Sequence, residues 1–368
     1  MLLYFILLFY WLILFRFAKD RKNHYTLFFA VLPLYLIMAL KSVSVGSDTI
    51  SYYNRYINAS YMLTEDRAIT EPGYNFVSYF FHDVLDVPFW FYNAIISAFI
   101  CYILSLFLKY YSPNTYLSLF LYMTIGLFTM SMSGLRQTIS ISICTIPLII
   151  AKAKQTKLEK SKIKRMILLL LGVAMVMLAY TFHNSALFFL PTLLLFNIRL
   201  SKRETIIICF IAIATLLFRS AIVTFMGDFV TERYEQYDIN AGYAMNILML
   251  LVPIAIGIFC VFVSRPDCAD LKYSKELSIM FIFLALQITF NNLALSHSQI
   301  ARLGYFFISS YVVLIPYALK SLAPRERSVA TFVVILLCLV FFYMGTNNGT
   351  LRIDNYKFFW QEPMYLRN

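Results

Sequence analysis

The chain consists of long apolar runs separated by short polar segments, and this pattern decides its fold class. A helix of about 20 apolar residues crosses the roughly 30 Å hydrocarbon core of a bilayer. The runs therefore predict an all-α polytopic membrane protein with about twelve transmembrane helices. We expect these spans near residues 2–17, 26–41, 88–108, 114–132, 135–151, 166–182, 184–198, 205–223, 244–263, 277–295, 302–319 and 329–345.

The composition agrees with one membrane domain over residues 1–368. Hydrophobic residues make up 61% of the chain and charged residues only 14%, against about 25% charged residues in ordinary soluble domains. The net charge of +12 is spread through the connections between spans, which argues against a nucleic-acid-binding surface. The six cysteines form neither a disulfide framework nor a CxxC metal motif. No linker or internal repeat divides the chain.

The basic residues assign the two sides of the membrane. The connections after odd-numbered spans hold 21 of the 31 Lys and Arg residues but 7 of the 19 Asp and Glu residues, so they are predicted to be cytoplasmic. Basic residues follow the first span and no small-residue cleavage site is present, which predicts an uncleaved span with its N-terminus outside. An even span count then places the C-terminus outside. The longest polar connections, 42–87 and 224–243, fall on this outer side and are expected to face the substrate.

The segment SGLRQTISISI, residues 133–143, places Arg136 and Gln137 after Gly134 at the outer start of a predicted helix. A charge in hydrocarbon is costly and usually faces a wet cavity or a charged partner. A helix N-terminus that carries an arginine is also suited to bind an anion, because its free N–H groups and dipole add to the guanidinium. The alternative is a structural ion pair of Arg136 with Asp48 or Glu71.

Other polar residues also fall on the outer side. His183, in AYTFHNSALFFLP, is suited to proton transfer near neutral pH, or it is a hydrogen-bonded turn residue. Arg302 opens a late span, and Arg233 and Tyr234 lie in the second long outer connection. Arg233 and Tyr234 are equally consistent with a solvated surface helix.

The first outer connection contains two further motifs. In GSDTISYYNRY, Asp48 precedes Tyr52 and Tyr53, and in ITEPGYNFVSYFF a Pro-Gly turn follows Glu71 and precedes Tyr74. Tyrosine rings are suited to contacts with sugars or with the membrane interface. Arginines, carboxylates, a histidine and tyrosines are thus predicted to gather on the outer face.

The order of these motifs resembles the EpsG-type family of bacterial polysaccharide polymerases, which are related in role to Wzy O-antigen and capsule polymerases. The motifs that carry the resemblance, spread over about residues 40–310, are D-x3-Y-Y, E-P-G-Y, S-G-L-R-Q, H-N-S-A-L and A-R-x-x-Y-F.

The resemblance implies an enzyme that joins oligosaccharide repeat units linked to undecaprenyl pyrophosphate at the outer leaflet of the bacterial inner membrane. It implies a GT-C-like fold with an outward-facing cavity, and glycosyl transfer to a sugar hydroxyl without a metal or another cofactor. The expected partners are membrane lipid, a chain-length regulator and a flippase.

Site roles follow from this chemistry. A pyrophosphate leaving group needs preorganised cations and N–H donors, which indicates Arg136, Gln137, Arg302 and Arg233. The sugar hydroxyl needs a base, for which His183, Glu71 and Asp48 are the candidates. The predicted glycan contacts are Tyr52, Tyr53, Tyr74, Tyr234 and Tyr305.

Two other functions stay open on the sequence. A transporter or flippase of the same lipid-linked glycan would carry charges deep in its spans and on both faces, often with internal repeats. A membrane glycan O-acyltransferase would carry a histidine and arginine cluster on the inner face. Neither pattern is present in the sequence, where His24 is the one inner histidine.

Overall fold

The computed structural model describes residues 1–19, 22–64, 71–154, 161–225, 247–266, 271–347 and 351–362. Within these ranges the protein is helical, and its β-type pairing is limited to isolated bridges between Lys41 and Phe358 and between Ser201 and Lys272. The chain forms two compact units. The first comprises residues 1–194 and 336–368, and the second comprises residues 195–335.

The predicted apolar runs all coincide with helices. The first unit contains α1 (Leu2–Phe17), α2 (His24–Ala39), α6 (Phe89–Tyr111), α7 (Thr115–Thr124), α8 (Leu127–Ser133), α9 (Leu135–Ala153), α11 (Lys162–Phe182) and the 3₁₀-helix η3 (Asn184–Leu195). The second contains α12 (Lys202–Phe225), α14 (Ile247–Val263), α15 (Lys275–Ala294), η4 (Ser298–Ile300), α16 (Ala301–Gly304) and α17 (Ser309–Lys320), and α18 (Pro324–Thr346) belongs to both units.

Six of the described helices are long and apolar enough to cross a bilayer, or seven if α7 and α8 form one bent span. These six are α6, α9, α11, α12, α15 and α18, while α1, α2, η3 and part of α14 are shorter apolar helices. The prediction of an all-helical polytopic membrane protein is confirmed. The count of twelve spans, the outer position of both termini and the outward-facing cavity stay predictions.

Three predicted spans differ from regular α-helices, and one of them, at 302–319, is interrupted between α16 and α17. The span at 114–132 bends by 58° between α7 and α8, where Gly126 adopts a left-handed conformation with φ of 105°. Only glycine adopts this conformation without a steric cost. The span at 184–198 is a 3₁₀-helix that contains Pro191, and proline lacks the N–H that an α-helical ladder requires.

The junction between α8 and α9 is fixed by a buried lysine. Lys41 is 6% exposed, and its Nζ donates to the carbonyl oxygen of Met132 and to Thr49 Oγ1 at 3.0 Å. The Met132 carbonyl lies in the last turn of α8, where a positive charge is favourable to the helix dipole. A Cβ at Gly46 would collide with the same carbonyl. The start of α9, immediately after this junction, is thereby held in place.

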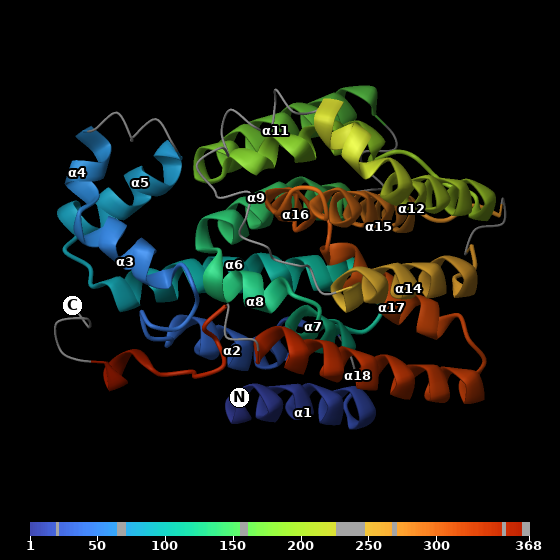
Figure 1. Cartoon of the computed structure of the whole chain (residues 1–368), viewed down its shortest axis with the longest axis horizontal. Helices are drawn as coiled ribbons and strands as arrows, with labels where there is room; N and C mark the ends of the chain where they lie inside the picture. The colour runs from blue at the N-terminus through green and yellow to red at the C-terminus, as the bar shows by residue number, and fades with distance from the viewer. Residues whose placement is uncertain are drawn as a thin grey trace. The chain divides into compact units, whose positions relative to one another are not determined.

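Three short helices, α3 (Thr49–Ile57), α4 (Ala59–Thr64) and α5 (Pro72–Tyr79), gather at one end of the first unit (Figure 1). The π-helix η2 (Phe80–Val84) continues α5. Helix α5 packs against α11, and a Cβ at Gly73 would clash with the side chain of Thr181. Glycine at this position allows the start of α5 to approach the end of α11.

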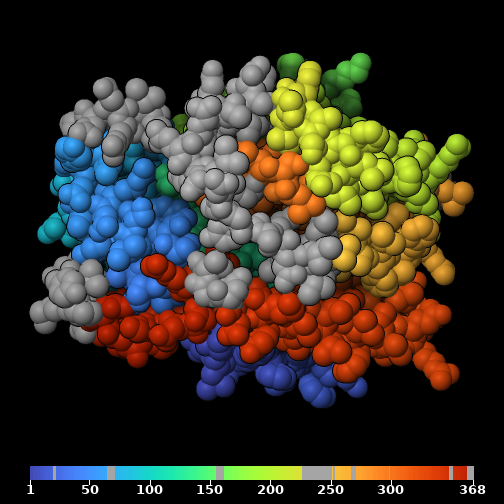
Figure 2. All heavy atoms as spheres, in the orientation of Figure 1, coloured from blue at the N-terminus to red at the C-terminus, as the bar shows by residue number. Residues whose placement is uncertain are grey.

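The segment 351–362, which contains the 3₁₀-helix η5 (Phe359–Gln361), lies against residues 40–46, and Figure 2 shows red C-terminal atoms beside blue N-terminal ones. Backbone hydrogen bonds join Ser42 N to Lys357 O at 2.9 Å, Phe359 N to Leu40 O at 2.9 Å and Gly46 N to Arg352 O at 3.0 Å. The hydroxyl groups of Ser42 and Ser44 both donate to Glu362 Oε1 at 2.5 Å. These contacts fix the connection between α2 and α3.

The two serine hydroxyl groups hold the pKa of the Glu362 carboxyl below its ordinary value. A carboxyl with a lowered folded-state pKa stabilises the fold above its ordinary pKa of about 4.3, and this contribution is lost as the pH falls through the lowered value. We expect Glu362→Gln to lower the free energy of unfolding at pH 7 by about 1.5–3 kcal/mol, as for hydrogen bonds to a charged group.

The measurement is thermal unfolding of the detergent-solubilised protein at pH 7 and pH 3. The loss of stability on acidification should be smaller in Glu362→Gln than in the wild type. Glu326→Gln, which changes a carboxylate in the first turn of α18, is the control. An acid destabilisation of equal size in Glu362→Gln and wild type would contradict the prediction.

Candidate functional site

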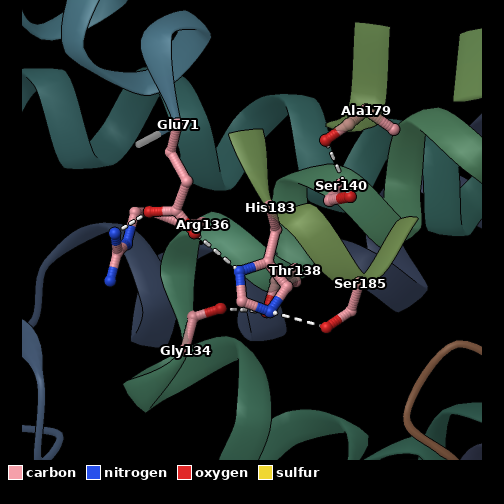
Figure 3. Close-up of polar contacts among 8 residues, drawn as sticks. All are labelled: Glu71, Gly134, Arg136, Thr138, Ser140, Ala179, His183 and Ser185. Carbon is pink, nitrogen blue, oxygen red and sulfur yellow. Dashed lines mark hydrogen bonds and ion pairs between the residues drawn. The ribbon is translucent and has the colours of Figure 1, made fainter. Parts of the chain in front are cut away.

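Three of the predicted polar residues meet in the first unit. Glu71 comes from the start of α5, Arg136 from the start of α9 and His183 from the end of α11 (Figure 3). Oε1 of Glu71 lies 2.8 Å from His183 Nδ1, and Oε2 pairs with the guanidinium of Arg136. Glu71 is only 7% exposed. A single buried carboxylate thus joins the cation and the imidazole.

The backbone at Glu71 directs its carboxylate toward this cluster. Glu71 has φ of 62° and ψ of 55°, a left-handed conformation that is uncommon for a residue with a side chain. Pro72, the first residue of α5, disfavours the right-handed helical conformation at the preceding position. The Glu71 side chain makes no cap hydrogen bond to its own helix, so its oxygens are available to the other two residues. Such strained positions concentrate at functional sites.

Arg136 is the second residue of α9 and lies over two tyrosine rings. Its Cζ is 5.4 Å from the ring centroid of Tyr52 and 6.0 Å from that of Tyr74, a range in which cation–π attraction is effective. Burial raises the pKa of the Tyr52 hydroxyl, and the nearby Arg136 acts in the opposite direction. Among the described residues, none accepts a hydrogen bond from Arg136 Nε. Its side chain is 26% exposed.

His183 caps the end of α11 and has a different partner on each ring nitrogen. Because an ionised carboxylate only accepts hydrogen bonds, Nδ1 donates to Glu71. Nε2 lies 3.4 Å from Ser185 Oγ. A carboxylate on Nδ1 fixes the ring orientation and the tautomer, and in the neutral ring it leaves the lone pair on Nε2. The side chain is 15% exposed.

The helices that carry these residues are joined directly. Ser140 Oγ of α9 donates to the carbonyl oxygen of Ala179 in α11 at 3.0 Å. Thr138 Oγ1 donates to the Gly134 carbonyl at 2.9 Å and closes the first turn of α9 (Figure 3). The relative positions of Arg136 and His183 therefore rest on buried hydrogen bonds as well as on Glu71.

The sequence left Asp48 and Glu71 as possible ion-pair partners of Arg136, and the structure distinguishes them. The partner of Arg136 is Glu71. Asp48 precedes α3, is exposed and accepts a hydrogen bond from the Ser47 hydroxyl at 3.0 Å. The structure therefore contains the ion pair of Arg136 with Glu71, and a contact of Arg136 with a phosphate stays a prediction.

Of the remaining predicted residues, only Gln137 adjoins the cluster among those described, and two lie outside the described ranges. Gln137 is buried next to Arg136, and Tyr53 is buried with its ring 5.4 Å from that of Phe89. Arg302 is exposed in α16 of the second unit, and Tyr305 follows that helix. Arg233 and Tyr234 lie outside the described residues.

Sequence reasoning assigned no role to Ser185 and gave Tyr52 and Tyr74 a different one. Both tyrosines are buried and lie under Arg136, so their first task is to support the guanidinium, and their contact with a glycan stays a prediction. The serine two residues after the histidine, in H-N-S, was the available signal for Ser185. Within the described ranges, no group of three or more His, Cys, Asp and Glu residues is placed to hold a metal ion.

Comparison with known proteins gives one finding. The model of the EpsG family matches residues 24–359, nearly the whole chain. No curated protein and no solved structure matches it.

The Glu71–Arg136 pair should show strong energetic coupling. Removal of one partner of a buried ion pair leaves an uncompensated charge and costs about 3–5 kcal/mol. We expect Arg136→Met to destabilise the protein strongly, and Glu71→Gln combined with Arg136→Met to restore part of the loss, with a coupling energy of about 0.5–3 kcal/mol. Thermal unfolding of the four proteins in detergent measures it. Asp48→Asn in place of Glu71→Gln is the control cycle, and additive effects in both cycles would contradict the pairing.

Proposed function

Because the chain belongs to the EpsG family, we propose that it polymerises oligosaccharide repeat units carried on undecaprenyl pyrophosphate. Family membership indicates a membrane protein with a polysaccharide polymerase role. The finer proposal is glycosyl transfer at the outer leaflet of the bacterial inner membrane, to a sugar hydroxyl of the next lipid-linked unit. The observation that supports it best is the Glu71 carboxylate, which holds a base and a cation side by side.

The reaction forms one bond and breaks another at the anomeric carbon, and it also removes a proton from the acceptor hydroxyl. A bond forms between the acceptor hydroxyl oxygen and the anomeric carbon, and the bond from that carbon to the pyrophosphate oxygen breaks. The pyrophosphate leaves with the bonding electron pair, and the acceptor hydroxyl releases its proton. A site for this chemistry needs a proton acceptor and a cation close together.

His183 is the proposed proton acceptor. Its Nδ1 donates to Glu71, so Nε2 carries the lone pair, which now faces Ser185 Oγ at 3.4 Å and accepts the proton of the sugar hydroxyl when the substrate takes the place of that serine. Glu71 then stabilises the imidazolium that forms, as the carboxylate does in a Ser-His-Asp triad. In this proposal Glu71 orients the base and is not itself the base. Asp48, which does not contact the cluster, is the least supported of the three candidate bases.

Arg136 is the residue that we propose to bind the pyrophosphate leaving group and to stabilise its negative charge. One side of its guanidinium pairs with Glu71, and Nε lacks an acceptor among the described residues. The start of α9 has no side-chain cap, so its first N–H groups add to the positive potential at the same end. Gln137, Arg302 and Arg233 are the proposed further contributors. The protein supplies this chemistry without a metal in our proposal.

Arg136→Lys tests the leaving-group role. Lysine keeps the charge but lacks the planar fork that binds two phosphate oxygens. Purified protein in proteoliposomes with lipid-linked repeat units should produce a ladder of glycan chains on a gel. We expect Arg136→Lys to slow chain growth about 10²–10³-fold, as for the loss of one preorganised donor. Arg325→Ala, at the start of α18, is the control. Chain growth by Arg136→Lys at the wild-type rate would remove the proposed role, and glycan movement across vesicles without elongation would support a flippase.

His183→Asn tests the base. Asparagine retains an N–H donor for Glu71 but cannot accept the proton of the sugar hydroxyl, so we expect elongation to fall about 10²–10⁴-fold. The wild-type rate should decline on acidification, because a protonated imidazole is no longer a base. The residual rate of His183→Asn should lack this decline. His24→Asn, at the start of α2, is the control. An unchanged pH–rate profile in His183→Asn would exclude His183 as the base.

A further inference from the structure

The helix that begins directly after Glu71 has its polar and apolar sides reversed relative to a helix in water. In α5, the polar residues Asn75 and Ser78 are 3% and 2% exposed, whereas Asp83 in η2 is exposed. Phe76, Phe80 and Val84 are 60%, 42% and 54% exposed. These three residues, here called the apolar stripe, follow one another at intervals of four and lie on one helical face.

The reversed pattern indicates contact with hydrocarbon. In water, a helix buries its large apolar side chains and exposes its polar ones. On the inner side of this helix, Ser78 Oγ lies 3.1 Å from the Tyr92 hydroxyl, so the polar residues are satisfied within the protein. Phe76 and Phe80, which face outward, need no hydrogen-bond partner and are compatible with a lipid environment. The apolar stripe therefore belongs to a membrane-facing surface, although it lies in a connection that the sequence predicted to be an outer loop.

The length of the element excludes a full crossing. Helix α5 has eight residues and η2 has five, about 20 Å in all at 1.5 Å per residue. A span needs about 20 residues, and apolar helices of 10–14 residues are typical of interfacial or re-entrant segments. The element therefore lies in one leaflet.

The charged end of η2 is held by the neighbouring short helix. Asp83 accepts a hydrogen bond from Ser60 Oγ of α4 at 2.6 Å and lies 3.3 Å from His82 Nδ1. Figure 1 shows α4 next to α5. The polar groups of η2 are thus engaged with α4 and with each other, and Phe76, Phe80 and Val84 stay available to lipid.

The stripe is continuous with a lipid-facing helix and with the candidate site. Helix α5 contacts α11 at Gly73, and α11 is a candidate span with 17% of its apolar window buried. Near that contact, Met177 and Leu178 of α11 are 48% and 45% exposed. Glu71 immediately precedes α5, and Phe76 follows it by five residues. A lipid with its head group at Glu71, Arg136 and His183 would have the first part of its chain beside Phe76.

We infer that the apolar stripe Phe76–Phe80–Val84 is the docking surface for the polyisoprenoid chain of the lipid-linked substrate in the outer leaflet. The inference rests on the proposed function for the identity of the head group. Two properties support this occupant: the three residues of the stripe are apolar and exposed, and the stripe begins five residues after Glu71, which holds the proposed base and cation. The first property would also suit a phospholipid. The second favours a lipid whose head group is bound by the candidate site.

Photo-crosslinking tests the inference. A benzophenone amino acid replaces Phe80 in the full-length protein, which is reconstituted in phospholipid vesicles with tritiated undecaprenyl pyrophosphate. The matched control carries the same group at Leu170 of α11, which is 61% exposed and lies nearer the predicted cytoplasmic end of that helix. A second control carries it at Asn54, an exposed polar position on α3.

We expect tritium incorporation at position 80 at least tenfold above that at positions 170 and 54, and competition by unlabelled undecaprenyl pyrophosphate but not by added phospholipid. Equal labelling at positions 80 and 170, labelling by phospholipid alone, or no labelling at position 80 would overturn the inference. Crosslinking needs no glycan transfer. Labelling without chain growth would therefore refute the proposed function alone, and chain growth without labelling would refute the docking surface alone.

Discussion

The arrangement of the first unit depends on the burial of one negative charge, that of Glu71. A carboxylate that is 7% exposed is tolerated only when opposite charge and hydrogen-bond donors surround it. Arg136 supplies the charge and His183 supplies a donor, and each comes from a different helix. The same carboxylate therefore requires three chain segments, 71–79, 135–153 and 162–183, to come together, and the chemistry of the cluster cannot be separated from its packing.

Further features of the first unit help to hold Glu71, Arg136 and His183 together. Gly73 lets α5 approach Thr181, Pro72 disfavours a right-handed helical backbone at Glu71, and Tyr52 and Tyr74 lie beneath the guanidinium. A guanidinium over aromatic faces keeps its charge while its edge stays available for hydrogen bonds. This distinguishes Arg136 from an arginine whose donors are all used by the fold. The surroundings hold Arg136 in position and leave Nε without an acceptor among the described residues.

Much of this was predictable from the sequence, because hydrophobic run length reports helices directly and the five motifs pointed to the correct family. Residues Glu71, Arg136 and His183 were each identified. The sequence did not show whether Asp48 or Glu71 pairs with Arg136. That choice depends on the close approach of α5 and α11 at Gly73, which no local sequence pattern reports. The reversed α5 was also missed: 13 residues of mixed polarity are too few for a span pattern and do not alternate clearly. Gly126 and Pro191 could have predicted two of the three irregular spans.

The contacts of residues 351–362 have a consequence for biogenesis. Ser42 and Ser44 are synthesised 320 and 318 positions before Glu362, their hydrogen-bond partner, and the intervening chain contains nearly all of the helices. The connection that leads into α3 therefore receives these contacts only after α18 has been synthesised. A nascent or truncated chain would contain Glu71, Arg136 and His183 but not the segment that fixes this connection. The geometry of the connection between α2 and α3 thus depends on residues 351–362, which are synthesised after Glu71, Arg136 and His183.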